Sequence, residues 1–418
     1  MNKEKKKAMV PKLRFEEFQE AGVWEEKQLS QICEVNPSIK ELPKTFVYVD
    51  LESVEAGILL QKKIIPLEGA PSRAQRLLKN GDIIFQTVRP YQKNNYFFQP
   101  KDKLDYVAST GYAQLRANQS NAYLFQYLHN DRFVDRVLEK CTGSNYPAIN
   151  SSDLAGIIVE IPELPEQQKI AAFLTSIDDL ITAQNEKIKA LQVHKKGLMQ
   201  QLLPAEGETV PRVRFREFEG LGEWEEKRIE DLAIRGSGHT PNRSQPNYYN
   251  GGVKWVSLAD SNRLDKGYIY ETKAEISVEG LKNSSAVLHP SGTVIVSRDA
   301  GVGKSAVLFS EMAVSQHFIA WHCDKSKLSN WFLYFFLQVI KPKIERIASG
   351  STIKTIGLPY FKGICITIPS IYEQQKIAAC LSSLDDLITA QSQKLEALKA
   401  QKKGLMQRLF PNTYETDV

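Results

Sequence analysis

The chain has 418 residues, of which 42% are hydrophobic and 25% are charged, and its formal net charge at pH 7 is +5. This length exceeds what one hydrophobic core usually holds, so two or more domains are expected, and the composition excludes a disordered chain. The mild positive charge permits a nucleic-acid partner without requiring one.

Five cysteines are scattered without any C-x-x-C pair, which indicates reduced thiols in the cytoplasm and argues against a disulfide framework or a zinc cage. The basic start of the chain is not followed by an apolar stretch, so we expect no signal peptide. The most apolar run, Trp331 to Ile340, is too short to cross a bilayer and is predicted to be a buried helix. We therefore expect a cytoplasmic protein without a membrane partner.

The first predicted domain, residues 1–163, opens with an arm of sequence VPKLRFEEFQEAGVWEEKQL that begins at Val10. Trp24 in this arm is expected to anchor in the core, with the neighbouring acidic residues exposed. An apolar strand from Ile83 to Val88 then delivers polar side chains to one end of the domain. A small polar Gly143-Ser144 turn precedes the last predicted strand.

Several of these polar side chains suit contact with DNA. Arg and Asn can read guanine and adenine edges bidentately, whereas Lys, Tyr and the backbone amides of a turn suit phosphates. The candidate DNA-contact residues of this domain are Lys62, Lys63, Arg73, Arg76, Arg89, Tyr91, Lys93, Asn94, Asn95, Ser144, Asn145 and Tyr146. The alternative interpretation is a solvated basic loop.

Residues 164–208 are predicted to form a first long helix and a linker. Pro165 and Glu166 suit the first helical turn, and Pro204 stops the helix. Core positions recur at alternating steps of four and three, which is the a/d pattern of a coiled coil. These positions are Ile177, Ile181, Gln184, Ile188, Leu191, Lys195, Leu198 and Leu202.

The second predicted domain, residues 209–370, begins with a matching arm, VPRVRFREFEGLGEWEEKRI, which places Trp224 where the first arm has Trp24. A loop punctuated by Gly and Pro follows, and an apolar strand from Gly292 to Arg298 comes later. The candidate DNA-contact residues of this domain are Arg235, Ser237, His239, Thr240, Asn242, Arg243, Arg298, Lys304, Ser351, Thr352 and Lys354.

Two motifs in the second domain look chemical, but their spacing argues against that interpretation. GVGKSAV resembles a phosphate loop, yet Arg298 stands where the pattern needs Gly, so Lys304 is expected at a hairpin tip as a phosphate contact. His317 and His322 lie five residues apart in a predicted strand, which places them on opposite faces and argues against a shared metal. We predict no catalytic residue and no metal ligand.

Residues 371–418 are predicted to be a second long helix that repeats the first. Residues 166–204 and 373–411 are identical at 27 of 39 positions without a gap. The heptad positions of the second helix are Leu384, Ile388, Gln391, Leu395, Leu398, Lys402, Leu405 and Leu409. The matching arms and helices form a frame that was duplicated and kept. Residues 33–160 and 233–367, the modules between the matching segments, share little sequence and therefore diverged. Neutral drift of loops is the alternative.

The polar heptad positions indicate the direction of the helix pair. A parallel pair would set Lys195 against Lys402, whereas an antiparallel pair sets Gln184 against Lys402 and Gln391 against Lys195, so that each ammonium meets an amide carbonyl. We predict an antiparallel intramolecular coiled coil. Two alternatives are that the lysines extend to water and that the helices pair between two chains.

The predicted fold class is therefore α+β, with two globular recognition domains separated by two long helices and related by a pseudo-twofold repeat. The first heptad stretch, residues 177–202, is about 39 Å long at roughly 1.5 Å per residue. One turn of DNA is about 34 Å, so two modules at the ends of such a rod would meet grooves roughly one turn apart.

Taken together, these residues resemble the specificity subunit of type I restriction-modification systems. The resemblance rests on the two arms, APSRA…GDIIFQTVRPY, GHTP…GTVIVSR…VGK, the Gly-Ser turns and both IP…EQQKIA…DDLITAQ…KKGLMQ helices. It covers nearly the whole chain. The first domain lacks the GHTP and VGK features of the second, so contacts in one domain do not map onto the other.

The resemblance implies that each domain is a target recognition domain for one half of a bipartite site in double-stranded DNA, and that the helices set the length of the unread spacer. It also implies docking of two modification (methyltransferase) subunits and, through them, of restriction subunits. S-adenosylmethionine, ATP and Mg²⁺ would belong to those partners, and this chain would hold no cofactor.

Two other function classes remain as alternatives. A coiled-coil adaptor would bridge proteins without touching DNA, and a gel shift with the assembled methyltransferase would separate it from a DNA reader. A stand-alone enzyme is disfavoured because no catalytic constellation is found, so we expect a non-catalytic subunit.

Overall fold

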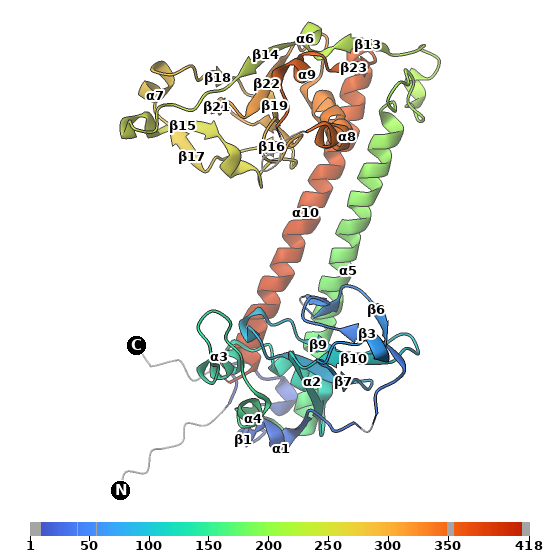
Figure 1. Ribbon diagram of the computed structural model, residues 1–418, viewed down its shortest axis with the longest axis vertical. Coiled ribbons are helices and arrows are strands. Elements are labelled where there is room, and N and C mark those ends of the chain that lie inside the picture. The colour runs from blue at the N-terminus through green and yellow to red at the C-terminus, as the bar shows by residue number, and fades with distance from the viewer. Residues whose placement is uncertain (1–9, 40, 56, 349–354, 412–418) are drawn as a thin grey trace. The chain divides into compact units, whose positions relative to one another are not determined.

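The computed structural model describes residues 10–39, 41–55, 57–348 and 355–411, which fold into two compact units (Figure 1). Unit 1 takes residues 1–184 and 394–418 of the chain, and unit 2 takes residues 185–393. Each unit therefore contains part of both long helices, α5 (Leu164–Leu202) and α10 (Ile371–Leu409). The helices that were predicted as separate domains are shared between the two units.

Unit 1 is built mainly from short strands, because its sequence alternates brief β-branched or aromatic runs with turn residues. Its strands are β1 (Glu25–Gln28), β2 (Cys33–Val35), β3 (Thr45–Val49), β4 (Val54–Glu55), β5 (Ile58–Leu59), β6 (Lys63–Pro66), β7 (Ala74–Leu77), β8 (Ile83–Gln86), β9 (Tyr96–Phe97), β10 (Tyr106–Ser109), β11 (Tyr112–Ala117) and β12 (Ile158–Ile161). Its shorter helices are α1 (Leu29–Ile32), α2 (Asn121–Tyr127), α3 (Asp131–Glu139) and α4 (Ser151–Ala155).

Two four-stranded sheets form the centre of unit 1, with strand orders β6-β3-β10-β7 and β2-β11-β8-β9. The pair β3–β10 is parallel, and the other neighbours in these two sheets are antiparallel. Because β10 and β11 are consecutive, the turn between them passes directly from one sheet to the other. This turn, residues 110–111, forms part of the candidate site described below.

Unit 2 repeats this plan with a different sequence. Its strands are β13 (Glu225–Arg228), β14 (Ala233–Ser237), β15 (Tyr249–Val256), β16 (Tyr268–Ile269), β17 (Ala274–Ile276), β18 (Leu288–His289), β19 (Val294–Ser297), β20 (Ser305–Leu308), β21 (Met312–Val314), β22 (Phe318–Cys323) and β23 (Cys365–Ile368). Its shorter helices are α6 (Ile229–Leu232), α7 (Val278–Lys282), α8 (Asn330–Ile347) and α9 (Leu358–Lys362).

The sheets of unit 2 have the orders β17-β15-β21-β18 and β14-β22-β19-β20-β16. The parallel pair β15–β21 stands where unit 1 has β3–β10, and β21 and β22 again cross between the sheets. The equivalent strands of the two modules therefore keep one order although their sequences diverged, and unit 2 adds β16 beside β20 at the edge of one sheet. The apolar run Trp331–Ile340 lies inside α8, as predicted, and no helix of the described residues is long and apolar enough to cross a membrane.

The arms close the frame of each unit in the same way. In unit 1, β1 pairs antiparallel with β12, and in unit 2, β13 pairs antiparallel with β23. Trp24 and Trp224 are each 3% exposed, whereas the acidic residues that follow them are exposed. The prediction of core anchors flanked by solvent-facing acids is confirmed.

A buried ion pair ties each arm to the start of a long helix. The Arg14 guanidinium donates to both carboxylate oxygens of Glu166, from Nε at 2.8 Å and from Nη2 at 2.6 Å. Arg214 does the same to Glu373, with both distances 2.7 Å. The Arg14 and Glu166 side chains are only 7% and 2% exposed, so Glu166 depends on Arg14 for its solvation, while Arg14 also donates to the carbonyls of Ala21 and Gly22.

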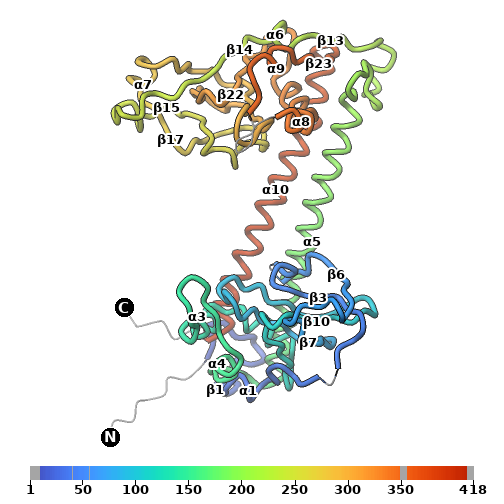
Figure 2. Tube along the Cα trace, in the orientation of Figure 1, coloured from blue at the N-terminus to red at the C-terminus, as the bar shows by residue number. Residues whose placement is uncertain are grey.

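The long helices run antiparallel within each unit, as Figures 1 and 2 show for the start of α5 beside the end of α10 in unit 1. Ile177 of α5 shares a core there with Met406 and Leu409 of α10. In unit 2 the end of α5 lies beside the start of α10, since Leu202 of α5 shares a core with Leu381 of α10. The predicted direction of pairing is confirmed.

The partners of the two heptad lysines differ from the prediction. Lys402 donates to Asp178 at 2.6 and 2.7 Å, and Lys195 donates to Asp385 at 2.5 and 2.6 Å. The expected acceptors, Gln184 and Gln391, were wrong because an ionised carboxylate is a stronger partner for an ammonium than a neutral amide is. The lysine side chains are 17% and 16% exposed, which also argues against a simple extension to water.

Removing one member of the buried ion pair tests how far each arm depends on it. We expect Arg14→Ala to lower the free energy of unfolding of unit 1 by about 3–5 kcal/mol, because Glu166 would remain buried without a partner. Hydrogen exchange of unit 1 peptides in urea would measure the change. Lys169→Ala is the control, since its pair with Glu17 is about half exposed and should contribute little to stability. A loss in Arg14→Ala no larger than that in the control would contradict the assignment.

A charge swap tests the pair between α5 and α10 in unit 1. We expect Lys402→Asp to destabilise unit 1 by about 1.5–3 kcal/mol, since a charged hydrogen bond is replaced by two facing carboxylates. Adding Asp178→Lys should restore most of the loss. Denaturation of the single and double variants would give the coupling energy, and a coupling near zero would show that the two side chains do not interact.

Candidate nucleic-acid interface

Four segments of unit 1 meet at one edge, which we call the unit 1 loop edge (residues 72–73, 87–95, 110–111 and 143–147). The backbone N–H of Thr110 donates to Arg73 at 2.8 Å, and that of Thr87 donates to Gly111 at 3.0 Å. The backbone N–H of Arg89 donates to Pro147 at 2.7 Å. Loops from both sheets are therefore hydrogen-bonded into one continuous surface.

Arg89 occupies a special position in this edge. Its backbone is left-handed, with φ 54°, and Lys93 four residues later is also left-handed, with φ 55°. Such conformations cost energy in residues other than Gly, and they persist where the surrounding structure holds them. The Arg89 guanidinium carbon lies 4.3 Å from the centre of the Tyr146 ring. Within the described part of the chain the guanidinium makes no hydrogen bond, so its donors remain for a base edge or a phosphate.

Some predicted contacts of unit 1 serve the protein itself. The Asn95 side chain is 1% exposed and accepts the backbone N–H of Gln86, which favours a role in holding the loop. Lys93 donates to Asp131 at 2.5 Å and to the carbonyl of His129 at 2.9 Å. Burial lowers the pKa of Arg76, which is half-buried.

Lys62 and Lys63 are exposed but do not join the unit 1 loop edge. Lys62 pairs with Asp102, which precedes β10, whereas the edge lies beyond the last residue of that strand. Asn94 is half-buried. The predicted residues that are exposed on the edge are Arg73, Tyr91, Ser144, Asn145 and Tyr146.

Unit 2 brings together three loops, which we call the unit 2 loop edge (residues 237–243, 298–304 and 315–317). The backbone N–H of His239 donates to Val314 at 3.1 Å, and that of Arg298 donates to His317 at 2.9 Å. A Cβ atom on Gly238 would lie 1.8 Å from the Val314 carbonyl oxygen, so only Gly permits this approach. The indole of Trp255 also donates to the His239 carbonyl, at 3.1 Å.

Side chains link these loops in a chain of hydrogen bonds. The Thr240 hydroxyl donates to Gln316 Oε1 at 2.5 Å. Gln316 Nε2 lies 3.4 Å from His317 Nε2, and His317 Nδ1 bonds the Asp299 carboxylate. Gln316 is exposed, whereas His317 and Asp299 are half-buried behind it. The amide is thus held in place at the surface by residues from all three loops.

Some of the remaining predicted residues of unit 2 are bonded within the protein or partly buried, and others are exposed. Lys304 Nζ donates to the carbonyl and the hydroxyl of Ser261, both at 3.1 Å, so it joins two loops. Arg235 is ion-paired with Glu230, and Arg298 is half-buried. Ser351, Thr352 and Lys354 lie outside the described residues. The exposed residues are Ser237, His239, Asn242 and Arg243.

The structure agrees with the interpretation of the GVGKSAV motif, which resembles a phosphate loop. β19 and β20 form an antiparallel hairpin, and Lys304 lies at its tip rather than in a phosphate loop. Among the residues that the structure describes, no group of three or more His, Cys, Asp or Glu side chains could hold a metal ion.

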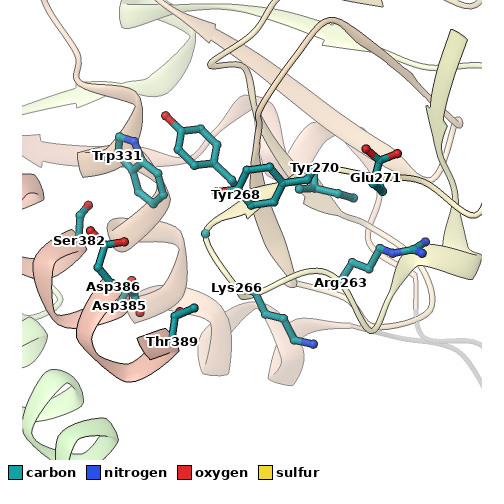
Figure 3. A pocket seen from close by; sticks show the side chains of 12 residues that line it. Arg263, Lys266, Tyr268, Tyr270, Glu271, Trp331, Ser382, Asp385, Asp386 and Thr389 are labelled. Carbon is teal, nitrogen blue, oxygen red and sulfur yellow. The ribbon is translucent and has the colours of Figure 1, made fainter. Parts of the chain in front are cut away.

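A cavity of about 600 Å³ lies elsewhere in unit 2 (Figure 3). It is lined by Arg263, Lys266, Gly267, Tyr268, Ile269, Tyr270, Glu271, Trp331, Ser382, Asp385, Asp386 and Thr389. Aromatic rings form one wall, and α10 supplies two carboxylates to the other (Figure 3). None of the lining residues belongs to the unit 2 loop edge. We therefore do not assign this cavity to the nucleic-acid interface.

Sequence reasoning missed Gln316 and Asp299, and it considered His317 only as a metal ligand. The available signal was the polar Ser-Gln-His step between two apolar runs, which is typical of a turn at a sheet edge. Thr240 was predicted as a contact, but its bond to Gln316 was not, because the two residues are far apart in sequence.

Two segments of the chain, residues 22–192 and 222–400, match the family described as "Type I restriction modification DNA specificity domain". The putative type I restriction enzyme MjaX specificity subunit of Methanocaldococcus jannaschii is 27% identical over 291 residues, which are 69% of this chain and 66% of that protein. The MjaIX specificity subunit of the same organism is 28% identical over 42% of this chain and 41% of that protein. These matches span less than two thirds of either relative.

A longer match is found in the HindI specificity subunit of Haemophilus influenzae, which is 22% identical over 79% of this chain and 86% of that protein. Two solved structures share the fold. The S subunit of a type I restriction-modification system from M. genitalium has a TM-score of 0.57 at 15% identity, over 97% of this chain and all of that one. A chain from a study of type I R-M complex assembly has a TM-score of 0.59 at 23% identity, over 93% and 98%.

The free donors of Arg89 generate a prediction about base discrimination. We expect Arg89→Ala to weaken sequence discrimination in one half of a bound DNA site by about 1–3 kcal/mol and to leave the other half unchanged. Competition binding with singly altered duplexes would measure this. Lys140→Ala, which removes an exposed charge at the end of α3, is the control. An equal loss on every sequence would instead indicate a phosphate contact.

Proposed function

Because this chain belongs to the type I restriction-modification DNA specificity family and carries two copies of its domain, we propose that it is the sequence-specific DNA-binding subunit of a type I restriction-modification complex. Each unit reads one half of a bipartite site in double-stranded DNA. The observation that carries the proposal is that two copies whose equivalent strands keep one order present different side chains at their loop edges.

The composition of the loop edges supports direct reading of DNA. Each edge combines an Arg with exposed polar side chains, such as Arg89 with Tyr146 in unit 1 and Arg243 with Asn242 in unit 2. Arg, Asn and Gln distinguish bases in the major groove, while hydroxyl and backbone N–H groups position the protein on phosphates. Because backbone hydrogen bonds already join the loops of each edge, the loops lose little conformational entropy when DNA binds.

The equal lengths of α5 and α10, 39 residues each, support a role for the helices in fixing the spacer that neither unit reads. Both helices have the same heptad positions, so α5 and α10 pair in the same register in unit 1 and in unit 2. A change in helix length would then change spacer length while leaving the two half-sites as they are.

The repeated frame supports docking of two copies of one partner. Val10 and Val210 are each 44% exposed, and they stand at the same position of the two arms. Two methyltransferase subunits would meet equivalent surfaces and would recruit the restriction subunits. S-adenosylmethionine, ATP and Mg²⁺ belong to these partners in the proposal, and this chain is a non-catalytic subunit that acts in the cytoplasm.

Salt dependence of binding tests the proposal directly. We expect the chain, assembled with its methyltransferase subunits, to shift a random duplex and to select a bipartite sequence from a library. Binding to about 6–10 phosphates would lower affinity roughly 10³- to 10⁵-fold between 50 and 200 mM salt. A gel-shift titration at several salt concentrations measures the slope.

Two outcomes would contradict the proposal. If the chain assembles with the methyltransferase but the complex shifts no DNA beyond what the methyltransferase shifts alone, the chain is an adaptor. If the pure chain turns over ATP or S-adenosylmethionine, it is an enzyme in its own right.

A further inference from the structure

We propose that Gln316 reads an adenine in the half-site that unit 2 recognises, and that Thr240, His317 and Asp299 position its amide. This inference rests on the proposed function and adds a specific base and a specific residue to it. It is carried by the hydrogen-bond chain across the unit 2 loop edge.

The order of donors and acceptors in this series of hydrogen bonds is set by Asp299. Its carboxylate can only accept, so His317 Nδ1 carries the proton of their bond. In the neutral imidazole, His317 Nε2 is then an acceptor and faces Gln316 Nε2 at 3.4 Å. This contact orients the NH₂ group of Gln316 toward the ring.

Thr240 completes the orientation from the opposite side. Its hydroxyl lies 2.5 Å from Gln316 Oε1 and donates to it. Reversal of the amide would place its carbonyl oxygen against the lone pair of His317 Nε2, whereas a hydroxyl can donate or accept. His317 therefore selects the orientation of Gln316, and Thr240 holds the amide in it with a donated hydrogen bond. The backbone bonds from His239 and Arg298 hold their loops in register.

The capacity that remains on Gln316 matches one base. A Gln amide has two N–H donors and two carbonyl lone pairs, of which the chain uses one each. One donor and one acceptor are left on an exposed side chain. Adenine offers the complementary pair in the major groove, N7 as acceptor and the N6 amino group as donor, whereas guanine offers two acceptors.

Unit 1 has no equivalent of this amide. The backbone bond from Thr87 to Gly111 corresponds to the bond from Arg298 to His317, so Thr110 stands where unit 2 has Gln316. Thr110 is half-buried, and its backbone N–H is bonded to Arg73. The adenine contact is therefore expected in one half-site only, which provides an internal control.

Library selection with the assembled chain and methyltransferase tests the inference. We expect Gln316→Ala to reduce the preference for A·T at one position of one half-site by roughly 5- to 150-fold and to leave the other positions unchanged. Thr240→Val removes the hydroxyl and should reduce the same preference, whereas Thr240→Ser retains it and should restore the wild-type value. Asn283→Ala, which removes an exposed amide from the end of α7, is the matched control and should change nothing.

The outcomes separate this inference from the proposed function. If the wild-type complex selects no sequence, both fail. If it selects a bipartite site and Gln316→Ala keeps every preference, or loses affinity equally on all sequences, only the inference fails. If Gln316→Ala disrupts the whole half-site through misfolding, the comparison of Thr240→Val with Thr240→Ser decides, because equal profiles for these two variants would overturn the positioning role.

Discussion

The buried pairing of an arm arginine with a helix glutamate is the interaction on which the rest of each unit depends. It is made twice with nearly the same geometry, by Arg14 with Glu166 and by Arg214 with Glu373. Because each glutamate is shielded from water, the arm must return to the beginning of a long helix for that charge to be solvated. The arm strand can then pair with the last strand of the module, and the module between them is held at both ends.

This closure explains how the two modules diverged without loss of the frame. The equivalent strands of both modules keep one order, and the loops at their edges are joined by backbone hydrogen bonds. Exposed side chains at the edges can therefore change with little effect on folding, whereas Asn95 and Gly238 hold their loops in place. Both units also pair the two long helices through one Lys and one Asp, so the frame is repeated in its polar contacts as well as in its sequence.

The sequence predicted the frame well, because the frame is encoded locally. The internal repeat, the heptads and the buried tryptophans all follow from periodicity and spacing, and the antiparallel direction was confirmed. The lysine partners were predicted wrongly because Asp178 and Asp385 lie outside the heptad core positions. The burial of Asn95 and the bond from Thr240 to Gln316 depend on loops that meet only in three dimensions, and no local pattern encodes such contacts.

Gly238 has a consequence for how such a protein acquires new targets. A side chain at this position would collide with the carbonyl of Val314, so the residue anchors its loop, in which His239, Asn242 and Arg243 are exposed. Natural variation and engineered libraries should therefore keep Gly238 unchanged and vary the exposed residues of the loop. Diversity belongs at the exposed positions 239, 242, 243 and 316, and a library that also randomises position 238 would consist mostly of chains whose recognition surface no longer forms.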